Sequence, residues 1–150
     1  MGWETVSLSD TQLEKPSPVA PGTYVFALQP GARYRTNKYN NIEELNVRFD
    51  VTEGDFAGRP MFVNYPDPTA VNKQGKPLAW SAQALKKLEI ALGVDALSGE
   101  GPAAYLNRVA TQGGRITATV LPGGTYIDNV TGKEKTEDPK FGIFTVQPAA

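Results

Sequence analysis

The feature that most constrains this chain is an alternation of apolar and polar residues over positions 44–52. Leu45, Val47, Phe49 and Val51 occupy every second position, and the residues between them are polar or charged. Successive side chains of a strand point to opposite faces of a sheet. The pattern therefore predicts a strand whose four apolar side chains share one buried face.

Four further segments have the aromatic and β-branched composition of strands. The chain contains 15 glycines and 12 prolines, a density of turn residues that favours short strands joined by turns. These predicted strands span residues 23–29, 59–65, 115–121 and 141–146.

Helical patterns lie between the third and fourth predicted strands. Ser81 is predicted to cap a helix that runs to Leu92 and ends before Gly93. Leu88 is central in its apolar stripe, and a shorter helix is predicted over residues 103–110.

The order of these elements predicts a mainly β fold: a five-stranded OB-fold-like Greek-key barrel with a helical insert between strands 3 and 4. The main alternative is a β-sandwich, which normally has about seven strands. Residues 1–20 show no helical or strand periodicity, so we expect them to form a flexible N-terminal arm. Trp3 is its one residue expected to contact another surface. Residues 21–150 form the predicted domain.

Composition limits the available chemistry. Cysteine and histidine are both absent, which excludes a disulfide scaffold, a Ser-His-Asp triad and a conventional zinc site. Among the carboxylates, Glu53 and Asp55 flank a glycine and are typical of a turn. We therefore predict no catalytic residue, no metal and no cofactor. A binding or structural protein is favoured over an enzyme, and a metal-dependent nuclease is a distant third alternative.

The sequence also bears on location. No apolar run approaches the roughly 20 residues of a membrane span, and the N-terminus lacks the basic and apolar regions of a signal peptide. We expect a cytoplasmic protein without a membrane partner. The net charge of −1 means that any nucleic-acid contact must come from local clusters of cations.

Residues 33–41 form the densest such cluster. Cations that neutralise phosphates and aromatic rings that stack on bases are what single-stranded nucleic acid requires, and this segment has both, without an acid. A solvated hairpin whose tyrosines fold back on the barrel is the alternative. The candidate residues are Arg33, Tyr34, Arg35, Lys38 and Tyr39.

A second group of candidates lies elsewhere. Arg48 is on the polar face of its strand, and Lys73 and Lys76 lie in a proline-rich loop. Phe62 and Tyr65 lie on opposite faces of the third strand, so one is predicted to be core and the other a stacking platform. Trp80, before the first helix, is predicted to be a core anchor.

Several stretches resemble a family of small bacteriophage proteins. Residues 46–62, with Glu53-Gly54 and Ala57-Gly58-Arg59 between two strands, are similar to that family's central hairpin. Residues 21–24, 85–94 and 114–120 resemble its first strand, helix and fourth strand. The family carries domain-of-unknown-function names and is regarded as OB-fold and single-stranded-DNA-binding-like.

Two functions follow from these observations. The resemblance implies a phage-type protein that binds single-stranded DNA during replication or recombination in the host cytoplasm. Its mechanism would be passive, with cations on phosphates and sequence-tolerant stacking of bases. The alternative is a structural or interaction module, such as a virion component, whose N-terminal arm docks on a second copy or on another phage protein.

Overall fold

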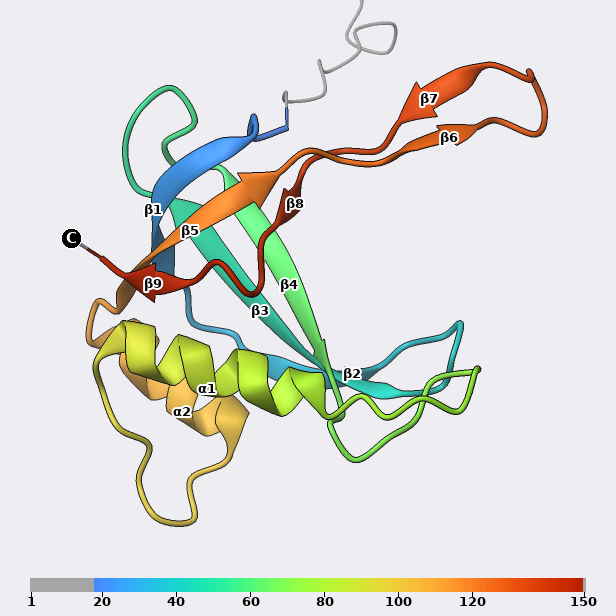
Figure 1. Ribbon diagram of the computed structural model, residues 1–150. Helices are drawn as coiled ribbons and strands as arrows, with labels where there is room; N and C mark the ends of the chain where they lie inside the picture. Colours follow the sequence, from blue (N-terminus) through green and yellow to red (C-terminus); the bar gives the residue numbers. More distant parts are fainter. Residues whose placement is uncertain (1–17, 150) are drawn as a thin grey trace, which may run out of the picture.

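The computed structural model describes residues 18–149, which contain nine strands and two helices. In Figure 1 the strands wrap around a core that the helices close on one side. The helices are α1 (Trp80–Leu92) and α2 (Pro102–Thr111). The strands are β1 (Gly22–Leu28), β2 (Arg33–Thr36), β3 (Glu43–Val51), β4 (Pro60–Pro66), β5 (Arg115–Leu121), β6 (Thr125–Ile127), β7 (Glu134–Thr136), β8 (Lys140–Phe141) and β9 (Gln147–Pro148).

The strands form one antiparallel sheet of seven and a separate hairpin. The path of the large sheet is β2-β3-β1-β5-β8, with β4 paired to β3 and β9 paired to β5, while β6 and β7 pair with each other. Within residues 18–149, β4 and β8 are not paired, so the predicted closed five-stranded barrel is not confirmed. A pocket of about 350 Å³ lies between them, with Met61 and Val63 on one side and Phe141 and Ile143 on the other.

The alternation in β3 has the predicted consequence. Leu45, Val47, Phe49 and Val51 are all buried in the core. The ring of Phe49 stacks on Phe141 of β8, with centroids 5.0 Å apart. This contact ties β8 to the core, although β8 is short.

The last predicted strand is interrupted. Instead of a continuous strand over 141–146, the structure has β8, a turn at Gly142–Thr145, and β9. The Thr145 hydroxyl accepts a hydrogen bond from the Thr119 amide at 2.8 Å, in the place of a backbone partner. A side chain at Gly142 would come within 2.6 Å of the Thr119 carbonyl oxygen, so only glycine permits this close approach.

The first helix begins differently from the prediction. Ala79 is its N-cap and makes no side-chain hydrogen bond, while Ser81 is buried on the helix's inner face, so the predicted serine cap is wrong. Gly93 ends the helix as expected, with a φ of 71°. Trp80 precedes the buried stripe that starts at Ser81, and it is 40% exposed, so it is not a core anchor.

The domain boundary also shifts slightly. Residues 18–20 belong to the folded part, because Val19 is buried and the Tyr24 hydroxyl donates a hydrogen bond to the Ala20 carbonyl at 2.6 Å. The rest of the predicted arm, including Trp3, lies outside the described residues.

Candidate nucleic-acid interface

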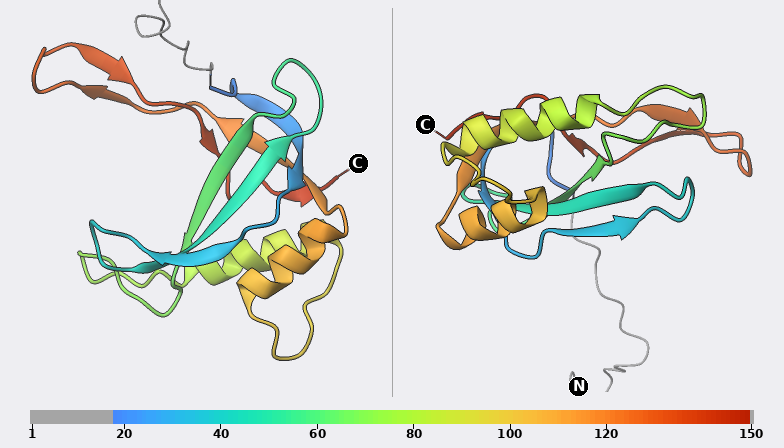
Figure 2. Two further views of the ribbon diagram at one scale, coloured as in Figure 1. Left: turned by 180° about the vertical axis from the view of Figure 1, so that it is seen from behind. Right: turned by 90° about the horizontal axis from the view of Figure 1, so that it is seen from below.

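The outer face of β2, β3 and β4 gathers several of the predicted site residues. Paired residues of an antiparallel ladder point to the same face. Arg33 pairs with Asn46, and Arg48 pairs with Phe62. Since Leu45 and Val47 point into the core, these four side chains point outward. Seen from behind in Figure 2, neither helix crosses this face of β3 and β4.

The turn that joins β2 to β3 is held by its own polar side chains. The Asn37 side-chain oxygen accepts a hydrogen bond from the Tyr39 amide at 2.8 Å, and that of Asn40 accepts one from the Ile42 amide at 3.0 Å. Asn41 adopts a φ of 57°, a conformation that asparagine tolerates better than most residues. The turn therefore presents Tyr39, which is 90% exposed, from a defined backbone.

A depression of about 280 Å³ lies beside this turn. It brings together Arg35, Lys38 and Tyr39, which were predicted from the sequence, with Asn64 of β4. The carboxylate of Glu44, which is paired with Arg35 across the strands, also lines it. The two cations outnumber this one carboxylate, and together with the exposed ring and the amide they suit a phosphate and an adjacent base.

The cations on this surface differ in how far they are neutralised. Arg48 forms a bidentate ion pair with Asp50, with nitrogen–oxygen distances of 2.8 and 3.1 Å. This carboxylate raises the pKa of Arg48. Arg33, Arg35 and Lys38 make no ion pair with any carboxylate of residues 18–149. These three therefore contribute more to the surface potential than Arg48 does.

The aromatic candidates are divided between the two faces. Phe62 is 60% exposed on the outer face, whereas Tyr65 is buried in the core. Of these two residues, Tyr65 is therefore the core residue and Phe62 is the exposed one. Burial raises the pKa of the Tyr65 hydroxyl. Tyr34 lies on the face of β2 opposite Arg33 and Arg35, and its hydroxyl accepts a hydrogen bond from the Ala103 amide at 3.2 Å. The structure therefore places Tyr34 and Tyr65 away from the outer face.

The two loop lysines lie outside the depression. Lys73 and Lys76 belong to the segment between β4 and α1, and neither lines the hollow beside Tyr39. Their loop and the β2–β3 turn project from the same end of the molecule, as Figures 1 and 2 show. The structure therefore does not bring them together with Arg35, Lys38 and Tyr39.

Sequence reasoning missed two asparagines of this face. The Asn46 amide donates a hydrogen bond to the Asn64 side-chain oxygen at 2.8 Å, which joins β3 to β4 on the outer surface. Alternation alone places both side chains outward. Their pairing depends on the register between the strands, which the sequence does not contain.

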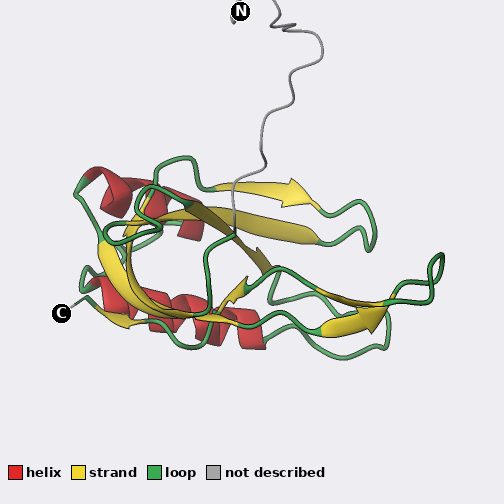
Figure 3. Cartoon of the chain, turned by 90° about the horizontal axis from the view of Figure 1, so that it is seen from above, coloured by secondary structure: helices red, strands yellow, loops and turns green. Residues whose placement is uncertain are grey.

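Sequence reasoning expected a long hairpin between residues 122 and 140, which the structure has as β6 and β7, but it missed the exposed apolar side chains on it. Figure 3 shows this hairpin extending from the body on the same side as the β2–β3 turn. Tyr126, Ile127 and Val130 are exposed on it. A tyrosine-isoleucine pair within a polar segment was the available signal.

No cluster of three or more acidic side chains within residues 18–149 is arranged to hold a metal ion. In the same part of the chain, neither helix has the length and apolar character needed to cross a membrane. The sequence matches no protein-family model and no characterised protein.

Proposed function

We propose that this protein binds single-stranded DNA, without sequence preference, on the outer face of β2, β3 and β4. The observation that carries the proposal is the hollow that joins unpaired cations to an exposed ring, lined by Arg35, Lys38 and Tyr39. Arg33 and Phe62 extend the same surface. Cations neutralise phosphates and release counterions, and exposed rings stack on bases of any identity.

The proposed fold is an OB-fold-like barrel with an open seam between β4 and β8. Support comes from the order of the strands, since β1 lies between β3 and β5 and both helices lie between β4 and β5 in the chain. OB-folds bind oligonucleotides on the corresponding strands and adjacent loops. Phage replication or recombination in the host cytoplasm is the setting that the family resemblance suggests.

The test is a fluorescence-anisotropy titration of the full chain with labelled oligo-dT of about 30 nucleotides, long enough to exceed one site. Titrations at about 50 mM and about 200 mM NaCl measure the salt dependence of the association constant. Binding that weakens steeply with salt supports the proposal. No binding at the lower salt concentration overturns it.

A second candidate function is a structural or interaction module. The exposed apolar side chains of the β6–β7 hairpin favour it, because isolated two-stranded hairpins are marginally stable in water and gain from packing on a partner. The docking of the N-terminal arm on a neighbouring subunit or a phage protein remains part of this alternative. Absence of oligo-dT binding together with concentration-dependent sedimentation would favour it.

A further inference from the structure

Strand β2 has a second face, opposite Arg33 and Arg35, and that face lines a groove. A pocket of about 270 Å³ lies there, between Tyr34 of β2, Glu43 of β3 and Asp67 after β4. It adjoins a pocket of about 200 Å³ between α1 and α2, because Leu85 and Pro102 line both. We call the two pockets together the helix groove.

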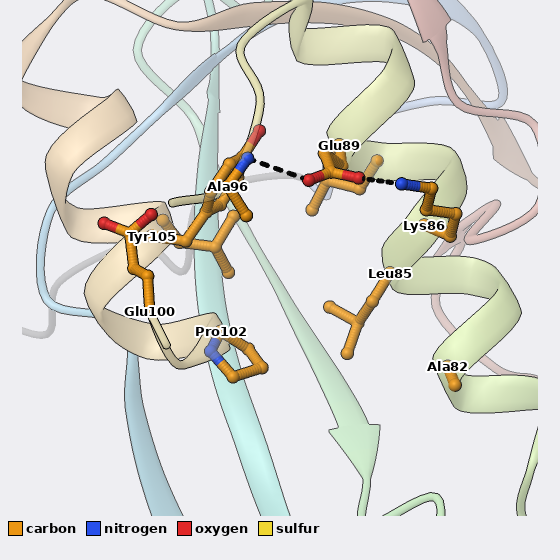
Figure 4. A pocket seen from close by; sticks show the side chains of 10 residues that line it. Ala82, Leu85, Lys86, Glu89, Ala96, Glu100, Pro102 and Tyr105 are labelled. Carbon is orange, nitrogen blue, oxygen red and sulfur yellow. Dashed lines mark hydrogen bonds and ion pairs between the residues drawn. The ribbon is translucent and has the colours of Figure 1, made fainter. Parts of the chain in front are cut away.

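The α1–α2 end of the helix groove is apolar. In Figure 4, Leu85 of α1 and Pro102 of α2 face each other across it. Leu88 and Leu106 contribute to its lining. The two acids at this end are neutralised, because Glu89 pairs with Lys86 and Glu100 pairs with Arg108.

The Tyr34 end carries uncompensated negative charge. Glu43 and Asp67 make no ion pair with any cation of residues 18–149. Asp67 accepts hydrogen bonds from the amide and hydroxyl of Thr69, at 2.9 and 2.7 Å, which lower its pKa and keep it ionised. The ring of Tyr34 lies in the same lining, so one position offers two carboxylates and an aromatic face.

The lining also holds one unused hydrogen-bonding group. Tyr65 contributes to the pocket beside Glu43, and no residue of the described chain hydrogen-bonds its buried hydroxyl. That oxygen is buried beneath the lining, however, so the peptide proposal below does not depend on it.

We propose that the helix groove binds an extended, basic segment of a partner protein. An apolar side chain of that segment occupies the space between Leu85 and Pro102. A neighbouring lysine or arginine lies against Glu43, Asp67 and the Tyr34 ring, where ion pairing and a cation–π contact act together. A nucleic acid is disfavoured here, because the same carboxylates repel phosphate.

The two faces of β2 therefore serve different ligands. Arg33 and Arg35 attract an anionic strand on one face, and Tyr34 with Glu43 attracts a basic peptide on the other. The two ligands can be bound at once. The peptide proposal does not depend on nucleic-acid binding, so each can fail without the other.

The experiment selects displayed random peptides of about twelve residues on the full chain, with counter-selection on Leu85→Asp. Enriched peptides are then made with a fluorescent label and titrated in solution. We expect each to combine an apolar residue with lysine or arginine. Oligo-dT should not displace them.

Surface variants test the charged end without touching the core. Glu43→Lys should weaken peptide binding by about tenfold and reduce its salt dependence. The control is Glu53→Lys, which makes the same charge change at the opposite end of the β3–β4 hairpin and should leave binding unchanged. Thermal unfolding midpoints verify that each variant is folded.

Three results would overturn the proposal. One is the absence of any enrichment that depends on Leu85. Another is equal binding of the selected peptides by Glu43→Lys and by the original chain. The third is self-association in sedimentation velocity that Leu85→Asp abolishes, which would make the helix groove a contact between copies of this chain.

Discussion

Two buried hydroxyl groups stand out at the scale of single residues. Tyr65 and Ser81 lie in the core, and neither side-chain oxygen has a hydrogen-bond partner among the described residues. Tyr105 provides the contrast, because its hydroxyl donates to the Val94 carbonyl. A buried polar group without a partner costs roughly 1–3 kcal/mol in lost hydration.

Tyr65→Phe is therefore expected to raise the free energy of unfolding by about 1 kcal/mol, since it removes the unpartnered oxygen and keeps the ring. Urea denaturation measures the change. Tyr105→Phe is the matched control and should lower the free energy of unfolding by about as much, because it removes the hydrogen bond to the Val94 carbonyl. A loss of stability in both variants would mean that the Tyr65 hydroxyl is hydrogen-bonded.

Stacking is a second property of individual residues. Phe62→Ala and Tyr39→Ala should each weaken oligo-dT binding by roughly 1–3 kcal/mol and leave its salt dependence unchanged, because stacking releases no counterions. Anisotropy titrations at two salt concentrations measure both quantities. Tyr34→Ala is the control, since Tyr34 faces α2. If Tyr34→Ala had the largest effect, the outer face would not be the site.

At the scale of elements, the β2–β3 hairpin carries three cations that form no ion pair with a carboxylate of residues 18–149. Changing Arg33, Arg35 and Lys38 together to serine should weaken oligo-dT binding and flatten its salt dependence. Each lost phosphate contact removes up to about 0.7 from the logarithmic slope. The same titrations as above measure this slope.

The control for that triple variant removes the same number of positive charges from the β6–β7 hairpin and from β8, which follows it. Lys133, Lys135 and Lys140 are changed to serine together, and two of them are ion-paired, Lys135 with Asp128 and Lys140 with Glu137. This triple variant should retain most of the binding. Equal losses in the two triple variants would show that net charge, rather than the hairpin, controls affinity.

An ion pair joins α2 to the segment between α1 and α2. Arg108 of α2 donates two hydrogen bonds to Glu100, both at 2.8 Å, and holds the pKa of that carboxyl at about 2 against an ordinary 4.5. The folded state thus binds this proton more weakly than the unfolded chain does. The stabilisation is complete above pH 4.5 and is lost as the pH falls towards 2.

Glu100→Gln should therefore be less stable than the original chain above pH 4.5, with the difference shrinking towards pH 2. Urea midpoints of both proteins across this range measure it. Asp67 and Glu89 also have lowered pKa values, but they titrate in both proteins and cancel in the comparison. A difference independent of pH would assign Glu100 a packing role instead.

At the scale of the whole molecule, one core joins the large sheet to both helices. The ring of Phe141 contacts Phe26 and Phe49, at centroid distances of 5.2 and 5.0 Å. Leu88 of α1 and Leu106 of α2 are buried in the same cluster. Packing of side chains therefore joins β8 to β1 and β3, although its backbone is paired with β5 within the described chain.

Leu88→Ala should lower the free energy of unfolding by roughly 2–5 kcal/mol, because it leaves a cavity beneath α1. Ile90→Ala is the control on the same helix, since Ile90 is 64% exposed, and it should change stability by about 0.5 kcal/mol or less. Urea denaturation measures both. Equal midpoints for Leu88→Ala and the original chain would show that α1 is peripheral to the core.

Local patterns in the sequence determined which face of a strand is buried, where a helix ends and which chemistry is available. The period of two in β3 is enough to assign its buried face, and Gly93 is enough to end α1, because both depend on neighbouring residues alone. The absence of histidine and cysteine likewise limits the chemistry whatever the fold. The cations of the β2–β3 hairpin were also evident as a cluster.

Only the tertiary structure decided which side chains meet. Alternation along β2 places Arg35 and Tyr34 on opposite faces, but the register of β2 on β3 decides which of them faces outward. A shift by one residue would exchange their faces. The break between β8 and β9 lies where Gly142 approaches Thr119 of β5 closely, a residue far from it in the sequence. The missing pairing of β4 with β8 within residues 18–149, and the helix groove, likewise depend on how distant segments come together. A periodic pattern reports how a residue is oriented on its own strand, but it carries no information about the partner that the strand will find.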